Sequence, residues 1–125
     1  MPEIKIIINH QEYQAELTDS PTAQKLWDTL PMEGQANVWG EEIYFEIPVS
    51  AQQEPNAREE VDVGTIAYWP AGSAFCIFFG PTPVSQGDQP KAYSPVNILG
   101  KIEGDVSGLK TVQQGTVVLL QKSNA

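Results

Sequence analysis

The stretch "YWPAGSAFCIFFGPTP", residues 68–83, decides the fold of this chain. It contains five aromatic residues and three prolines within a chain that is otherwise polar and acidic. Its centre, "AFCIFF" at 74–79, is typical of a strand, and both faces of that strand are apolar. One face can line a core. The other must be covered by a helix or a loop, or remain as an apolar surface patch.

Short strands before and after this stretch predict a mainly β protein. A helical period appears at residues 20–30, where Ser20 is the expected N-cap and Pro21 fits the first helical position. A short helical turn is expected within 106–112. About eight strands in one small chain favour a closed barrel, because closure removes exposed sheet edges. The predicted strands lie at 3–9, 12–17, 35–39, 41–48, 65–70, 74–79, 96–104 and 115–120.

The length and charge of the chain narrow the classes of function. Its 125 residues predict a single domain spanning 1–125. The formal net charge of -9 repels phosphate backbones and anionic lipid, so neither nucleic acid nor a membrane is an expected partner. No apolar run approaches the roughly 18 residues of a membrane span, and the start does not resemble a signal peptide. We expect a cytoplasmic protein.

Two segments are predicted to be loops. Residues 50–62 are polar and acidic, and residues 80–95 hold several prolines and glycines. Long loops in compact domains often carry function, so the second segment is a candidate region for a site.

Three segments carry a family resemblance: "WGEEIYFEIP" at 39–48, "VGTIAYWPAGSAFCIFFGPTP" at 63–83 and "VNILGKI" at 96–102. Together with the hairpin and helix before them, they resemble the small stand-alone cyclophilin-like proteins of bacteria and archaea. The resemblance covers nearly the whole chain. It implies a prokaryotic protein with a closed cyclophilin-like β-barrel of about eight strands, one clear α-helix and a short helical turn. It implies no established activity, since most members have none.

The resemblance does not extend to the catalytic pattern of prolyl isomerases. In that class an arginine lies beside a phenylalanine-rich pocket and donates to the prolyl nitrogen. This chain has one arginine, Arg58, and its neighbours are Glu59 and Glu60 rather than aromatic residues. Activity inferred from fold alone is an analogy. A divergent peptidyl-prolyl cis-trans isomerase is therefore the alternative function, and whether the protein is an enzyme stays open.

Metal and nucleophilic chemistry have little support in the sequence. His10 is expected to be a solvated turn residue and Cys76 a buried, inert thiol, so we expect no metal site and no cofactor. Glu42 and Glu46 share one strand face about 13 Å apart, which favours two surface acids. A further hypothesis is an enzyme or accessory subunit for a small polar substrate, in which Glu42, Glu46 or Asn97 converge on one cavity.

The preferred hypothesis is a binding module that holds a peptide or small ligand in an aromatic groove, with the segment 80–83 as its rim. Tyrosine and tryptophan are favoured there because each carries a polar atom that needs a partner. Core packing and a homodimer contact are the alternatives for the aromatic residues, and the Asn97 amide could instead tie down loop backbone. The expected ligand-binding residues are Tyr44, Tyr68, Trp69, Phe79, Thr82 and Asn97.

Overall fold

The computed structural model describes residues 2–123, and it is mainly β with one α-helix and two 3₁₀-helical turns. The helix is α1 (Pro21–Thr29), and the 3₁₀ turns are η1 (Pro70–Gly72) and η2 (Ser107–Thr111). The strands are β1 (Glu3–Ile8), β2 (Gln11–Leu17), β3 (Met32–Gln35), β4 (Asn37–Trp39), β5 (Glu42–Glu46), β6 (Arg58–Glu60), β7 (Thr65–Trp69), β8 (Ala74–Phe78), β9 (Lys91–Ile102) and β10 (Val117–Lys122).

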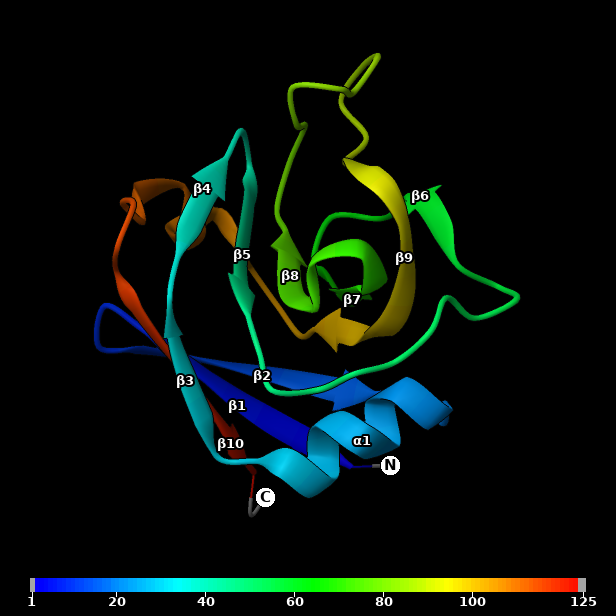
Figure 1. Ribbon diagram of the computed structural model, residues 1–125. Coiled ribbons are helices and arrows are strands. Elements are labelled where there is room, and N and C mark those ends of the chain that lie inside the picture. The colour runs from blue at the N-terminus through cyan, green and yellow to red at the C-terminus, as the bar shows by residue number, and fades with distance from the viewer. Residues whose placement is uncertain (1, 124–125) are drawn as a thin grey trace.

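The strands form one strongly curled sheet with the order β3-β10-β1-β2-β9-β7-β8-β5-β4, and β6 pairs with β9 beside this path. The two ends of the order, β3 and β4, follow each other in the chain and are separated only by the buried Ala36. Figure 1 shows them as one long stretch at the side of the molecule. The two ends of the curled sheet are therefore joined by the chain itself, at Ala36.

The expectation of a closed barrel of about eight strands needs correction. The sheet that residues 2–123 form has ten strands and is not closed by hydrogen bonds. The physical reason lies at Ala36: up to Gln35 the chain pairs with β10, and from Asn37 it pairs with β5 instead. One bent segment thus serves both ends of the sheet, and no ladder between two strands closes it.

Local sequence signals explain the first elements. The β1–β2 hairpin has a two-residue loop, Asn9 and His10, and both residues have positive φ angles of 53° and 65°. Such a turn matches the twist of the strands that it joins. The hydroxyl of Ser20 accepts a hydrogen bond from the Ala23 amide and caps α1, as predicted. Figure 1 shows α1 at one end of the curled sheet, near β1 and β2.

Strand β9 is longer than the sequence predicted. It begins at Lys91, within the segment 80–95 that was expected to be a loop. Its first half pairs with β6, from Arg58↔Val96 to Glu60↔Lys91, with a shift in register between these pairs. Pro95 lies in this irregular part, where a missing amide hydrogen is tolerated. Its second half pairs with β7 and β2.

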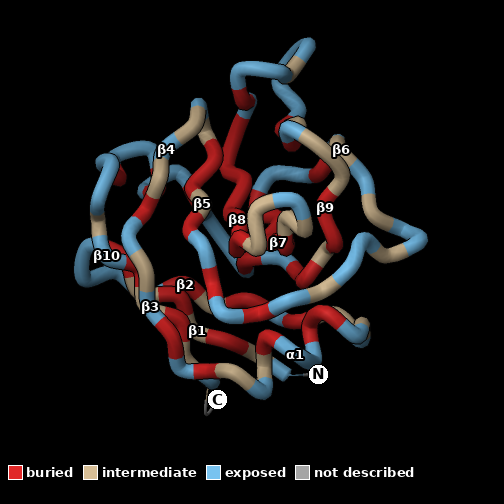
Figure 2. Tube along the Cα trace, in the orientation of Figure 1, coloured by how far each residue is buried: buried red, intermediate tan, exposed pale blue. Residues whose placement is uncertain are grey.

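Two separate hydrophobic clusters explain why β7 and β8 are apolar on both faces. One face, including Ile66, Phe75 and Ile77, belongs to the main cluster inside the curled sheet. Figure 2 shows these central strands as buried. The opposite face belongs to a second cluster, which β9 and the segment leading into β7 cover. The members of this second cluster are Val61, Ala67, Ala74, Cys76, Phe78, Ala92 and Val96.

No helix among residues 2–123 is long and apolar enough to cross a membrane.

Candidate ligand-binding site

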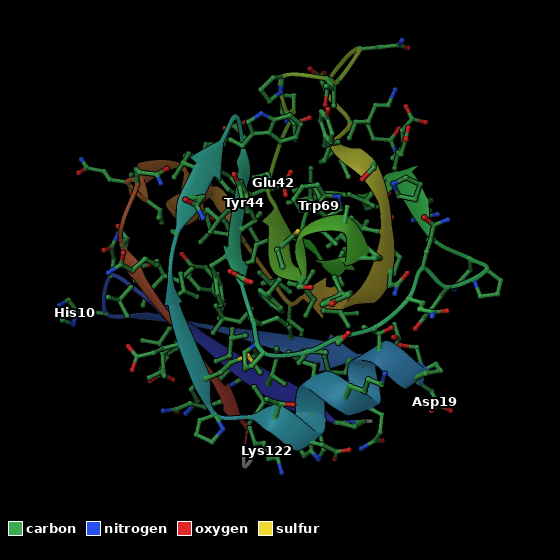
Figure 3. The ribbon with its side chains drawn as sticks, viewed as in Figure 1. His10, Asp19, Glu42, Tyr44, Trp69 and Lys122 are labelled. Carbon is green, nitrogen blue, oxygen red and sulfur yellow. The ribbon has the colours of Figure 1, made fainter. Side chains whose placement is uncertain are left out.

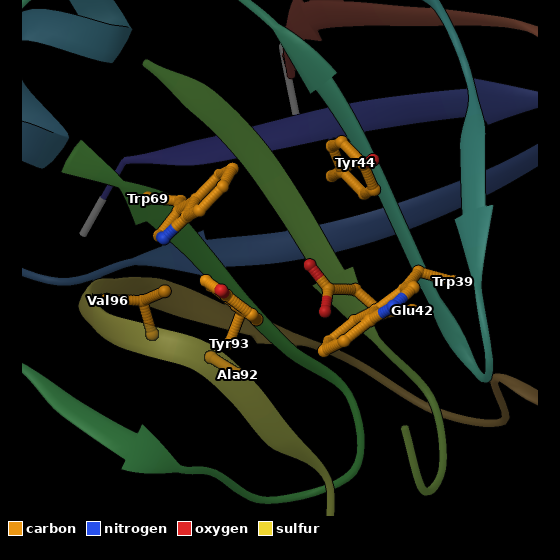
Figure 4. A pocket seen from close by; sticks show the side chains of 7 residues that line it. All are labelled: Trp39, Glu42, Tyr44, Trp69, Ala92, Tyr93 and Val96. Atoms are coloured by element: carbon orange, nitrogen blue, oxygen red, sulfur yellow. The ribbon is translucent and has the colours of Figure 1, made fainter. Parts of the chain in front are cut away.

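A pocket of about 250 Å³ opens beside the second cluster, and Figure 4 shows the side chains around it. Its volume lies just below the range of about 300–1,000 Å³ that is usual for pockets of drug-sized ligands, so it suits a smaller molecule. Most of its lining is aromatic or aliphatic, with a single carboxylate. The lining residues are Trp39, Glu42, Tyr44, Trp69, Ala92, Tyr93 and Val96.

The β4–β5 hairpin brings three of these side chains together. Trp39 at the end of β4 pairs with Glu42, and Tyr44 lies two residues further on the same face of β5. The turn between the strands contains Gly40 with φ of 60°, where a Cβ atom would lie 2.7 Å from Pro83 Cδ. Glycine is thus needed both for the backbone angle and for the close approach of the segment 80–83.

The segment 80–83 supports this turn. The amide of Glu41 donates to the Pro81 carbonyl at 2.9 Å. None of residues 80–83 lines the pocket. The segment therefore contacts the β4–β5 turn, between Trp39 and Glu42, and is not the rim of the pocket.

Four aromatic rings stand one after another around the pocket, and each is nearly perpendicular to the next. Trp39 and Tyr93 have ring centroids 6.3 Å apart at 73°, and Tyr93 and Trp69 have the same separation at 84°. Trp69 and Tyr44 continue the series at 6.3 Å and 76°. Perpendicular rings that line one cavity form adjacent walls, as in an aromatic cage.

Trp69 is held in place through its polar edge. Its indole Nε1 donates to Ser94 Oγ at 2.6 Å, which links the end of β7 to β9. Tyr93, the neighbour of Ser94, is 71% exposed and forms an outer wall of the pocket. Trp69 is partly buried and held by this hydrogen bond, whereas Tyr93 is exposed, so the pocket opens to solvent beside Tyr93.

Glu42 is the one charged residue in the pocket lining, and its carboxyl points toward the space between the rings (Figure 4). The residue is only 5% exposed, and its Oε1 has no hydrogen-bond partner. Burial raises the pKa of Glu42 to about 7, and a hydrogen bond with the Cys76 thiol on β8 acts in the opposite direction. Burial, together with this carboxyl, also raises the pKa of Cys76. The pocket therefore contains an acid that changes charge near neutral pH.

The burial of Glu42 corrects one interpretation of the sequence. Glu42 and Glu46 were both expected to be surface acids, and Glu46 is indeed exposed. Glu42 is buried because its cross-strand partner on β8 is Phe78, a fully buried member of the second cluster. The alternation in β5 gave the face of Glu42 correctly, but not that β9 covers part of this face.

The expected ligand-binding residues are distributed over several environments. Tyr44 and Trp69 lie in the pocket. Tyr68 and Phe79 belong to the main core, where they are 1% and 5% exposed. The Tyr68 hydroxyl donates to the Val49 carbonyl at 2.6 Å and accepts from the Ala51 amide at 3.3 Å, so its polar atom has partners within the protein.

Thr82 and Asn97 hold backbone segments. The Thr82 hydroxyl donates to the Lys91 carbonyl and so ties the proline-rich segment to β9. Asn97 Oδ1 accepts from the Glu54 amide at 2.8 Å, and its Nδ2 donates to the Gln52 carbonyl at 2.9 Å. Neither residue lines the aromatic pocket.

The sequence did not identify Trp39 and Tyr93 as site residues. Trp39 was placed at the end of a predicted strand, and Tyr93 in a predicted loop. The sequence holds one signal for Tyr93: in "KAYSPV", 91–96, this tyrosine lies between the apolar residues Ala92 and Val96. Only the pairing of β9 with β6 and β7 brings this segment next to Trp69.

The residues that other chemistries would require lie elsewhere. Arg58 is exposed and lines a cleft with glutamates, glutamines and Lys91, without an aromatic residue. His10 is exposed in the β1–β2 turn, far to one side of Glu42 and Trp69 in Figure 3. Among the described residues, no group of three or more His, Cys, Asp or Glu side chains could hold a metal ion.

Comparison with known proteins identifies the family. Residues 2–121 match the family described as cyclophilin-like. This chain belongs to the cyclophilin-like family. The match covers nearly all of the chain, including every element that builds the pocket.

A solved structure supports this assignment. The cyclophilin-like chain is similar to a hypothetical protein from Archaeoglobus fulgidus whose structure was determined in solution, with 37% sequence identity. The similarity covers 98% of this chain and 95% of the archaeal chain, with a TM-score of 0.83. A comparison with curated proteins found no match. The family and the fold are thus established.

Proposed function

We propose that this cyclophilin-like protein is a binding protein for a small ligand, which it holds in the pocket between Trp39, Tyr44, Trp69 and Tyr93. The observation that carries the proposal is the set of four rings that stand as walls around a surface cavity. Aromatic side chains contribute most to the stability of a fold when they are fully buried. Rings that leave a cavity open to solvent are therefore better explained by an occupant than by core packing.

The buried carboxyl supports the same proposal. A polar atom without a partner costs about 1–3 kcal/mol when it is buried. Glu42 Oε1 is such an atom. Its position in the pocket lining means that a bound molecule could supply the missing partner. A ligand site thus accounts for the rings and for the carboxyl together.

The size of the cavity favours a small molecule over a long peptide. At about 250 Å³ the pocket accepts a small molecule or one side chain. Arg58, the only arginine, lines a different cleft. No structural feature of the pocket therefore favours prolyl isomerisation over simple binding.

The three tryptophans provide a direct test. Trp39 and Trp69 line the pocket, whereas Trp27 lies on α1 beneath Lys122. We expect a fragment library of amines, acids and neutral molecules to contain compounds that shift the indole N–H signals of Trp39 and Trp69 in two-dimensional ¹⁵N NMR spectra. The Trp27 signal should stay in place and is the internal control.

The variant Tyr93→Ala makes this test specific to the pocket. Tyr93 is 71% exposed, so its removal should leave the fold intact while it deletes one wall. Binding of the selected fragments should weaken by about tenfold, which corresponds to about 1.4 kcal/mol. Fragments that shift all three indole signals equally, or no shift from any compound, would contradict the proposed function.

A further inference from the structure

We propose that the ligand of this pocket is a small alkylammonium ion, whose charged nitrogen is held between the aromatic walls and the Glu42 carboxylate. The inference rests on the proposed function and names the chemical class of the ligand. Four features of the molecule support it: the rings, the unpaired carboxyl oxygen, the placement of the basic side chains and the titration of Glu42.

The arrangement of the rings suits a cation. The face of an aromatic ring attracts a positive charge within about 6 Å of its centroid, and tryptophan is the strongest partner. Trp39, Tyr93 and Trp69 form successive walls at nearly right angles, with centroids 6.3 Å apart. A cation inside the cavity would therefore be within reach of more than one ring. The alkyl groups on its nitrogen would contact the apolar ring surfaces.

The carboxyl of Glu42 selects among ligands by charge. A neutral apolar ligand would leave Oε1 buried and unpaired, and an anion would be repelled by the carboxylate. An ammonium group supplies the opposite charge beside a carboxyl that is only 5% exposed, where an ion pair is stronger than between fully exposed groups. In its ionised form, Glu42 thus favours a cation over an anion or a neutral apolar ligand.

The basic side chains near this site form ion pairs with acidic residues other than Glu42. Lys91, next to the pocket residue Ala92, has its Nζ 4.0 Å from Glu59 Oε1. Lys110 has its Nζ 3.9 Å from Glu41 Oε2. Among residues 2–123, no lysine, arginine or histidine forms an ion pair with Glu42. With a net charge of -9, the molecule as a whole also attracts cations.

The charge of Glu42 should couple binding to pH. The titratable groups around it are Tyr44 on its own strand, Cys76 on β8 and Tyr93 on β9. The remaining pocket residues, Trp39 on β4, Trp69 on β7, and Ala92 and Val96 on β9, carry no charge. Since the pKa of Glu42 lies at about 7, its carboxylate form dominates only above that pH. Cation binding should therefore strengthen between pH 6 and pH 8, with release of a proton.

Choline and its uncharged carbon analogue, 3,3-dimethylbutan-1-ol, are the probes that test this inference. They have nearly the same shape and differ in the charge of the central atom. We expect choline to shift the indole signals of Trp39 and Trp69 at pH 8 and to bind at least about tenfold more tightly than the alcohol. Comparison of choline with an acetylated, amidated trimethyllysine then tells whether a free molecule or a side chain presents the ammonium group better.

Two glutamine substitutions on one strand provide a test of the carboxylate and its matched control. Glu42→Gln should weaken choline binding at pH 8 by about tenfold and abolish its pH dependence. Glu46→Gln removes a charge from an exposed position of the same strand and should leave both unchanged. Chemical shifts of the main-chain amides outside the pocket verify that both variants are folded.

The outcomes separate this inference from the proposed function. Equal binding of choline and the alcohol at Trp39 and Trp69 would overturn the inference and leave the proposed function intact. Choline binding that is stronger at pH 6 than at pH 8 would also overturn it, because a protonated Glu42 would then be the preferred form. Absence of any shift with either probe would overturn it as well, and the fragment library would then decide the proposed function by itself.

Discussion

Glu42 loses most of its contact with water when the protein folds, and the consequence is a stability that depends on pH. Its pKa is raised from an ordinary value of 4.5 to about 7, with burial as the main cause. The folded protein therefore keeps this proton up to about pH 7, while the unfolded chain loses it near pH 4.5. The favourable contribution is fully present below pH 4.5 and is lost as the pH rises through 7.

The expected size of this effect is about 3 kcal/mol, because each pKa unit corresponds to about 1.4 kcal/mol. Urea unfolding at a series of pH values should show the free energy of unfolding of the native protein falling between pH 5 and pH 8. In Glu42→Gln this component should be absent. Glu46→Gln loses the same formal charge from an exposed site and should keep the decrease. A decrease of the same size in all three proteins would contradict the assigned burial of Glu42.

The side chains show where reasoning from sequence at the residue scale reaches its limit. Asn97 was a predicted site residue, and its amide does have partners within the protein, the Glu54 amide and the Gln52 carbonyl. The sequence left open whether those partners belong to a ligand or to a loop. Glu42 and Glu46 occupy equivalent positions in the alternation of β5, and only their cross-strand neighbours distinguish them. These neighbours lie far away in the sequence.

At the scale of elements, the antiparallel pairing of β2 with β9 contains the close contact between strands that depends most on a glycine. A Cβ atom on Gly100 would lie 2.0 Å from the carbonyl oxygen of Glu16 and 3.2 Å from Leu17 Cα. Both contacts are to backbone, which cannot rotate out of the way. Gly100 also pairs with Ile66 of β7, so the strand is held on its other side.

Gly100→Ala should therefore force β2 and β9 apart and destabilise the protein by about 3 kcal/mol. Gly87→Ala is the matched control, because a Cβ atom there meets no atom within 4 Å. Its effect should stay within about 1 kcal/mol. Urea unfolding monitored by tryptophan fluorescence measures both. Equal stability of the two variants would show that the strands are not held as closely as described.

The elements that sequence predicted well are those with local signals. Helix α1 begins at Pro21 after the Ser20 cap, and the β1–β2 and β7–β8 connections lie where polar and small residues interrupt the apolar pattern. Strand β6 and the beginning of β9 were missed. They pair with each other across a shift in register, and Pro90 and Pro95 make this segment look like a loop. Their pairing is a property of the tertiary structure.

At the scale of the whole molecule, two clusters rather than one determine where the pocket lies. A sheet that is apolar on both faces needs cover on the outside, and here the first half of β9 supplies most of it. The part of the sheet that β9 covers ends at Tyr44 and Trp69. Both side chains pack against the second cluster and remain partly exposed. The sequence predicted surplus apolar surface beside the central strands, and the structure places the pocket at the margin of that surface.

The sheet as a whole differs from the predicted barrel for a related reason. Strand counts and apolar faces favour closure, but they do not tell whether the last ladder forms. Here the chain itself joins the two ends through Ala36, between β3 and β4. Strand β4 stands at the end of the sheet order and pairs with β5. Trp39, the last residue of β4, lines the pocket.

One measurement tests the central claim most directly, namely that this pocket is a ligand site built around the Glu42 carboxyl, whose Oε1 has no partner. It is a ¹³C NMR titration of the Glu42 side-chain carboxyl, in the protein alone and in the presence of saturating choline. We expect a pKa of about 7 in the protein alone and a clearly lower value with choline, because the cation favours the charged form. A value near 4.5 in the protein alone, or one that choline leaves unchanged, would contradict the claim.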